Sequence, residues 1–303
     1  MSGMKEIREH IAGVKSTQKV TNAMYLIAST KMRRAKEELE KTRPFFTALS
    51  GEIERIFQCA GEIESPYFFK GDADDDTQDG TYAYVVVTAD RGLAGAYNQN
   101  VIQETLRRLK KHPNSRLFVV GSNGRKFFSG HGVPVEKSFL YTAQNPSLRR
   151  AREVAALLLD LYDRREITKL FVIYTDVVNS VEMHVRTARL LPLESERFLS
   201  AQERERPRRI RFEPSAEAVL ASIVPAYAAG FLYAAVVDSF CAEQNARAAA
   251  MDAANQNEEE LLRELTLAYN HERQGAITRE ITEVSAGAKS REHHGKEAQH
   301  AHG

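Results

Sequence analysis

The stretch "MKEIREHIAGVKSTQKVTNAMYLIASTKMRRAK" (residues 4–36) carries apolar or small side chains at alternating steps of four and three residues. The spacing continues along the next helical stretch, and the seam positions are Met4, Ile7, Ile11, Val14, Gln18, Thr21, Tyr25, Ala28, Met32, Ala35, Leu39, Thr42, Phe46, Leu49, Ile53, Ile56 and Ala60. Such a sustained heptad predicts one helix over residues 1–60 that supercoils with a partner helix. Pro44 is expected to end or bend it. The alternative is two ordinary amphipathic helices on a globular core.

The C-terminal part of the chain, residues 215–288, predicts a second long helix that starts at Ser215. Its expected seam passes through Leu265 and ends on Ile277, Ile281 and Val284. Helices of this length reach about 80–100 Å, more than a domain of this size is wide. We therefore predict an antiparallel coiled coil between the two ends of the chain. Residues 289–303, which are rich in histidine, are expected to be a disordered tail, with metal binding as the alternative.

Residues 218–237 contain no charged side chain and are long enough to cross a bilayer. Pro225, Gly230 and two tyrosines interrupt this stretch, and highly charged sequence flanks it. A fully buried helix of a globular protein has the same composition. We favour that interpretation and expect no direct transmembrane segment.

The middle of the chain, residues 81–200, alternates strand and helix patterns. Strands are predicted at 81–88, 116–121, 133–140, 169–177 and 181–191, and helices at 98–111, 123–129 and 147–164, the last capped by Asn145. Alternation of this kind predicts a largely parallel, Rossmann-like sheet. The predicted fold class is thus α/β, a central Rossmann-like domain with a long antiparallel coiled coil made of the terminal helices.

The stretch "TADRGLAGAYNQNV" (88–101) follows the first predicted strand and resembles the outline of a phosphate-binding turn. Gly92 and Gly95 give GxxG only, so neither the dinucleotide motif nor the P-loop is present. We therefore interpret Asp90, Arg91, Gly92 and Gly95 as a structural turn in which glycine lets the chain turn tightly. No catalytic residue, cofactor or metal site is predicted from motifs. The net charge of +1 does not favour nucleic acid.

Three stretches together resemble the gamma subunit family of F-type ATP synthases: residues 4–36, residues 88–101, and residues 242–288, "AEQNARAAAMDAANQNEEELLRELTLAYNHERQGAITREITEVSAGA". The resemblance implies a rotor shaft inside a ring of α and β subunits. Its α/β domain would rest on the c-subunit ring beside the epsilon subunit, at the cytoplasmic face of the cell membrane. The subunit itself would be non-catalytic and would couple proton flow to ATP synthesis or hydrolysis at the β subunits. The alternatives are a nucleotide-binding α/β enzyme and a coiled-coil scaffold without a rotary role.

The resemblance also implies contact residues. No acidic residue lies between Ile11 and Lys36, so this basic face could meet an acidic lever of the β subunit. The resulting candidates for β contact are Met24, Lys31, Arg33, Arg34, Arg273, Gln274 and Thr278. The candidates for contact with the c ring or epsilon are Arg208, Arg209, Arg211 and Glu213. The alternative for each set is an ordinary solvated surface.

Overall fold

A computed structural model describes residues 2–60, 65–69, 80–177, 182–194 and 211–300 of the chain. Its elements along the sequence are α1 (Ser2–Ala60), β1 (Phe68–Phe69), β2 (Tyr82–Val87), α2 (Tyr97–Lys111), β3 (Ser115–Val120), α3 (Ser122–Gly130), α4 (Leu148–Asp163), β4 (Lys169–Val177), β5 (Met183–Leu191), β6 (Leu193–Glu194) and α6 (Ala216–His300). The chain forms two compact units. We call residues 1–25 and 251–303 the rod unit and residues 26–250 the domain unit.

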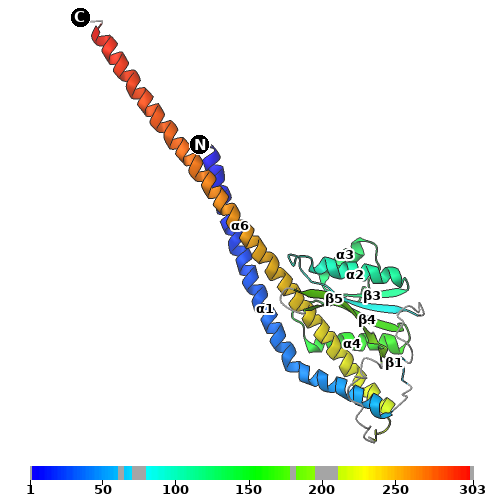
Figure 1. The fold of residues 1–303 in the computed structure, drawn as a ribbon. Helices are drawn as coiled ribbons and strands as arrows, with labels where there is room; N and C mark the ends of the chain where they lie inside the picture. Colours follow the sequence, from blue (N-terminus) through cyan, green and yellow to red (C-terminus); the bar gives the residue numbers. More distant parts are fainter. Residues whose placement is uncertain (1, 61–64, 70–79, 178–181, 195–210, 301–303) are drawn as a thin grey trace. The chain divides into compact units, whose positions relative to one another are not determined.

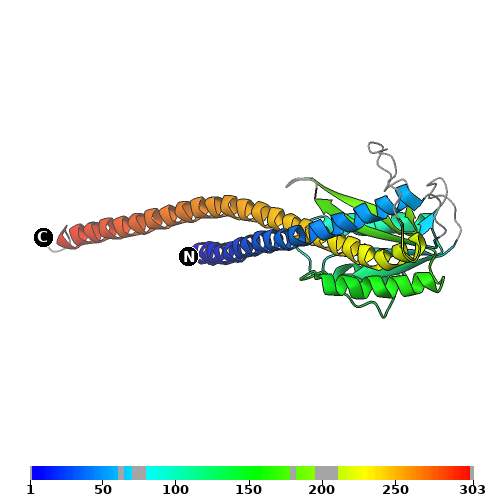
Figure 2. The same ribbon diagram turned by 90° about the horizontal axis from the view of Figure 1, so that it is seen from below.

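The rod unit is a pair of helices. The start of α1 and the end of α6 run side by side in opposite directions in both views (Figures 1 and 2), and α6 continues past the N-terminus of α1. The heptad spacing is confirmed along α1, because the predicted seam positions from Met4 to Ile56 are buried or half-buried, with Tyr25 as the exception. Tyr25 is 36% exposed and Met24 is half-buried, so Met24 takes that place in the seam.

A polar contact lies in the seam where the heptad pattern is interrupted. The hydroxyl oxygen of Thr21 lies 2.5 Å from Oδ1 of Asn255 and 3.0 Å from Oε2 of Glu258. Thr21 is 9% exposed, so its hydroxyl is satisfied by α6 and by its own helix rather than by bulk water. A polar group at one seam position favours the single register that pairs it.

The domain unit is built on a four-stranded sheet in the order β3-β2-β4-β5. The first three strands are mutually parallel, and β5 pairs with β4 in the antiparallel direction. Side chains alternate between two cores, as the period of a strand requires. Val85 of β2 faces the core formed with α1, α4 and α6, whereas Tyr84 faces the core on the α2 and α3 side. Figure 1 shows these helices on opposite sides of the sheet.

The inner halves of both long helices belong to the domain unit. Ile53 and Ile56 of α1 and Leu220 and Val224 of α6 are buried in the same core as β2 and β4. By length and composition alone, α6 could cross a membrane, since an 18-residue window reaches a mean hydropathy of 1.8. Half of that window is buried within the structure. The uncharged start of α6 therefore covers one face of the sheet.

Several predicted boundaries were wrong for local reasons. Residues 133–140 form no strand, because Pro134 lacks an amide proton; the segment instead runs along the edge of β3, where Glu136 N donates to Leu117 O at 2.9 Å. The cap of α4 is Ser147, whose hydroxyl accepts from Arg150 N, and not Asn145, which has a φ of 51°. The prediction that Pro44 ends or bends the first helix is confirmed in its second form, because α1 is continuous through Pro44 and bends in that half of the helix (Figure 1).

The C-terminal helix is longer than predicted. α6 runs to His300, whereas the sequence indicated an end near residue 288 and a disordered tail. Residues 289–300 contain no proline and a single glycine, so their composition does not break a helix.

Candidate functional site

The turn after β2 is held by Asp90. Its Oδ1 accepts from Ser122 N at 2.9 Å, at the start of α3, and its Oδ2 accepts from Ala143 N at 2.9 Å and Gln144 N at 3.1 Å. The hydroxyl of Thr142 donates to the same Oδ2. Both carboxylate oxygens are thus occupied by the protein itself. Asp90 ties two loops and a helix start together at the carboxyl end of the sheet.

The two glycines of this turn differ. Gly95 has a φ of 51°, a conformation that favours glycine, and its backbone lies against α6, where an added Cβ would meet Ala246 O at 3.9 Å. At Gly92 an added Cβ would meet nothing within 4 Å, and φ lies outside the left-handed region. The conformational requirement for glycine is therefore at Gly95. Leu93, between them, has a φ of 62° and is 64% exposed.

A buried ion pair fastens this turn to α6. Arg247 Nη1 lies 2.7 Å from Glu243 Oε1, and Arg247 Nη2 donates to Gly92 O at 3.1 Å and Arg91 O at 3.4 Å. Burial raises the pKa of the Glu243 carboxyl, and the hydrogen bond from Arg247 works in the opposite direction. The sequence analysis missed this pair, because Glu243 and Arg247 look like an ordinary i, i+4 pair on a helix surface.

The basic residues predicted for partner contact lie on the surface of α1. Lys31, Arg33 and Arg34 are all exposed, and Arg33 lies 3.9 Å from Glu37 with both side chains mostly in solvent. Met24, predicted as a contact residue, is half-buried in the seam. Only the outer edge of Met24 is therefore accessible. More accessible apolar surface lies next to it on Val20, Leu26 and Ile27.

The predicted contact residues of α6 are also exposed. Arg273, Gln274 and Thr278 lie on the part of the helix in the rod unit, and the hydroxyl of Thr282 donates to Thr278 O at 2.8 Å. The exposed residues Ile277, Ile281 and Val284 lie beside them and are 46%, 61% and 68% exposed. The prediction that these three complete the seam was wrong. The reason is that α6 extends past the first residues of α1 within this unit.

The predicted foot residues are described only in part. Arg211 Nε lies 3.9 Å from Glu213 Oε1, and both side chains are almost fully exposed, so the pair contributes little. Arg208 and Arg209 lie outside the described residues.

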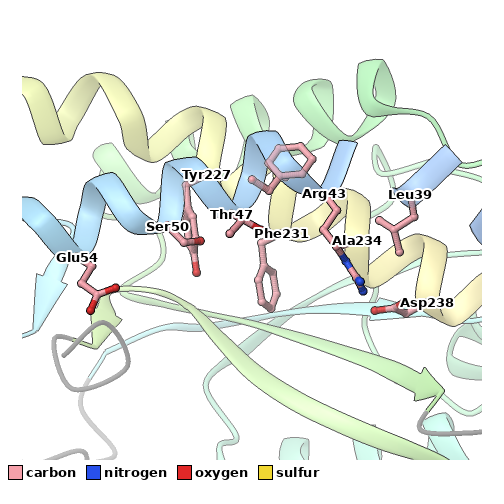
Figure 3. A pocket seen from close by; sticks show the side chains of 11 residues that line it. Leu39, Arg43, Thr47, Ser50, Glu54, Tyr227, Phe231, Ala234 and Asp238 are labelled. Atoms are coloured by element: carbon pink, nitrogen blue, oxygen red, sulfur yellow. The ribbon is translucent and has the colours of Figure 1, made fainter. Parts of the chain in front are cut away.

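A groove in the domain unit was not anticipated from the sequence. It has a volume of about 410 Å³ and lies between α1 and α6 (Figure 3). Its lining consists of Leu39, Arg43, Phe46, Thr47, Ser50, Glu54, Tyr227, Gly230, Phe231, Ala234 and Asp238. Burial, and then the nearby charge of Asp176, raises the pKa of Asp238 from 3.8 to about 6.

Replacing Asp238 by asparagine is expected to raise the free energy of unfolding by about 1–3 kcal/mol near pH 8. Because the folded state raises this pKa from 3.8 to about 6, folding favours the protonated carboxyl. The stability that this preference contributes is fully present below pH 3.8 and is lost as the pH rises through about 6. Urea unfolding at several pH values measures the difference, which should vanish near pH 4. A gain that is equal at all pH values would contradict the assignment.

Comparisons with known proteins agree along almost the whole chain. A family profile described as ATP synthase matches residues 3–290. The ATP synthase gamma chain of Ruminiclostridium cellulolyticum is 35% identical over 295 residues, covering 96% of this chain and 99% of the relative. The gamma chain of Caldanaerobacter subterraneus subsp. tengcongensis is 39% identical, covering 94% and 99%.

Solved structures show the same fold. A chain of the Euglena gracilis mitochondrial ATP synthase, in a structure of OSCP, F1 and the c-ring in rotational state 3, is similar with a TM-score of 0.64 and 17% identity, covering 97% of this chain and 96% of that one. A chain of the rotor of the same enzyme gives a TM-score of 0.59 at 15% identity. At these identities the likeness concerns the fold alone. With the family profile and the relatives above, the chain belongs to the ATP synthase gamma chain family.

Proposed function

We propose that this chain is the rotor shaft of a proton-translocating F-type ATP synthase. The observation that carries the proposal is the match to gamma chains over nearly the full length of both proteins. A protein of this kind transmits torque and holds no catalytic site of its own. Proton flow through the membrane sector would turn it, and its rotation would drive the catalytic β subunits through their binding states; ATP hydrolysis would run the same path in reverse.

The rod unit has the surface that such a role requires. Its two helices pair along one seam, while their outward faces carry both cations and exposed large apolar side chains. Exposed apolar residues of this kind on a helix indicate a surface that another protein covers. We infer that α and β subunits surround this unit, and that its residues Met24, Arg273, Gln274 and Thr278 meet the β subunits. We infer the same contact for Lys31, Arg33 and Arg34, which lie on the following turns of α1 in the domain unit.

The domain unit would be the foot of the rotor. We infer that it contacts the epsilon subunit and the c-subunit ring through the region that includes Arg208, Arg209, Arg211 and Glu213. The uncharged start of α6 is used in the core of this unit, which supports peripheral attachment rather than a membrane span. The complex would sit at the membrane with this subunit on the cytoplasmic face.

Co-purification tests this proposal directly. A tag on the chain should retrieve α, β and epsilon subunits from a detergent extract of its native membranes, at one copy of the chain per six α and β subunits. Isolated chain should show no ATP or NAD binding on titration, which separates the rotor from a nucleotide-binding enzyme. Retrieval of the chain without α and β subunits would reject the rotor and favour a scaffold.

Replacing Arg273 and Gln274 together by alanine is expected to lower coupled ATP synthesis about tenfold in reconstituted enzyme. Both side chains are exposed, so the fold should not change, while a guanidinium that bonds a partner carboxylate would be lost. The matched control replaces Arg149 and Arg152, two exposed arginines of α4, by alanine and should leave synthesis unchanged. Equal synthesis in both double variants would remove Arg273 and Gln274 from the coupling surface.

A further inference from the structure

The groove between α1 and α6 has aromatic walls and carboxylates at both ends. Figure 3 shows Tyr227 and Phe231 of α6 beside Ser50 and Thr47 of α1, with Glu54 at one end and Asp238 at the other. Glycine at position 230 allows the ring of Phe46 to lie close to α6, because a Cβ at this position would lie 2.0 Å from that ring. A volume of about 410 Å³ is that of a small-molecule site, and several aromatic side chains line it.

Asp238 is the unusual member of this groove. Among the described residues none forms an ion pair or a hydrogen bond with its carboxylate, although the residue is half-buried. The charged groups that act on it are Asp176, Arg43 and Lys36; Arg43 Nη1 lies 3.1 Å from Glu40, and Asp176 Oδ2 lies 2.6 Å from Arg186. A partly buried carboxylate without a direct partner costs the fold free energy.

The geometry points to a binding site for an organic cation on an apolar stem, whose ammonium or guanidinium group pairs with Asp238. The lining carries the carboxylates of Glu54 and Asp238 against the single guanidinium of Arg43, so the site favours a positive ligand. The rings of Phe46, Tyr227 and Phe231 would cover the stem and attract the cation through their faces. The site lies in the domain unit and does not depend on the rotor proposal.

Ionised Asp238 is required for this pairing. Binding should therefore weaken as the pH falls below about 6, where the carboxyl takes up its proton. The other charged groups that act on Asp238 are Asp176 of β4 and Arg43 and Lys36 of α1. The loss of binding is expected to follow the protonation of Asp238.

Tryptamine tests the site, because the chain contains no tryptophan and the indole of the probe is then the only indole that fluoresces. With the full-length chain, the fluorescence anisotropy of tryptamine should rise on binding. The neutral analogue 3-ethylindole and the anion indole-3-propionate should bind at least about tenfold more weakly, because each lacks the charge-assisted hydrogen bond. Asp238→Asn should remove this preference. The control Asp160→Asn, on the exposed side of α4, should keep it.

The cation has two chemical sources, a free amine or a lysine or arginine of another subunit. If tryptamine binds the isolated chain and not the assembled complex, a partner side chain fills the groove; if it binds both, the ligand is a free amine. Either result supports a cation site. Equal affinity for the three indoles, or tryptamine binding that Asp238→Asn leaves unchanged, overturns it. Phe231→Leu should weaken all three probes together, which shows that the same groove is measured.

Discussion

Replacing Arg247 by alanine is expected to lower the free energy of unfolding by about 3–5 kcal/mol. Arg247 is 9% exposed and Glu243 is 3% exposed, so the variant leaves an unpaired carboxylate in the interior. It also removes the donor to the carbonyl oxygens of Arg91 and Gly92. Urea unfolding of the full chain measures the loss. Faster amide hydrogen exchange in residues 88–95 should accompany it.

A second variant separates the ion pair from simple packing. Replacing Glu243 by leucine and Arg247 by methionine together removes both charges at similar volume, and most of the lost stability should return. The turn would still lack its donor, so hydrogen exchange in residues 88–95 should remain faster than in the wild type. If Arg247→Ala costs less than about 1 kcal/mol, the turn is held by Asp90 alone, and the role given to Arg247 is wrong.

The arrangement of the long helices could be predicted because a heptad is a local, periodic signal. The seam from Met4 to Ile56 is buried or half-buried at every predicted position but Tyr25, and the three parallel strands follow short apolar runs. The spacing could not predict that Met24 occupies the seam in place of Tyr25, because both side chains are apolar enough for that position. The packing of α1 against α6 leaves Tyr25 exposed, and the sequence of α1 alone carries no information about that packing.

Other errors arose where the partner of a segment decides its environment. Ile277, Ile281 and Val284 continue the apolar pattern of α6, yet they are exposed, because burial depends on how far α1 extends beside them. The stretch 133–140 has the composition of a strand, but Pro134 and the neighbouring turn leave it as a cover for the edge of β3. The local sequence pattern therefore predicts whether a segment is helix or strand, but it does not predict which other segments cover it.

Some residues of the candidate sites could likewise be predicted from the local sequence, and others could not. Exposed cations such as Lys31 and Arg33 could be placed on a helix surface from the charge run alone. Asp238 gives no such signal, because one acidic residue in a long helix is most often solvated. Its burial results from α1, α6 and β4 meeting around it, and those elements are far apart in the sequence. The same holds for Glu243 and the turn that it helps to hold.

Replacing Gly121 by alanine is expected to destabilise the domain unit by about 3 kcal/mol or more. Gly121 has a φ of 93°, and a Cβ there would lie 2.1 Å from Thr88 O, at the end of β2. The same carbonyl end of the sheet carries Asp90, so the shift needed to relieve this contact would also disturb the turn. Gly92→Ala is the matched control, because its Cβ would meet nothing within 4 Å; it should change stability by less than about 1 kcal/mol. Thermal unfolding of both variants, followed by circular dichroism, ranks them. If Gly92→Ala lowers the stability more than Gly121→Ala does, the steric constraint at this end of the sheet lies in the turn after β2. The close approach of β3 and α3 to Thr88 would then not be the constraint.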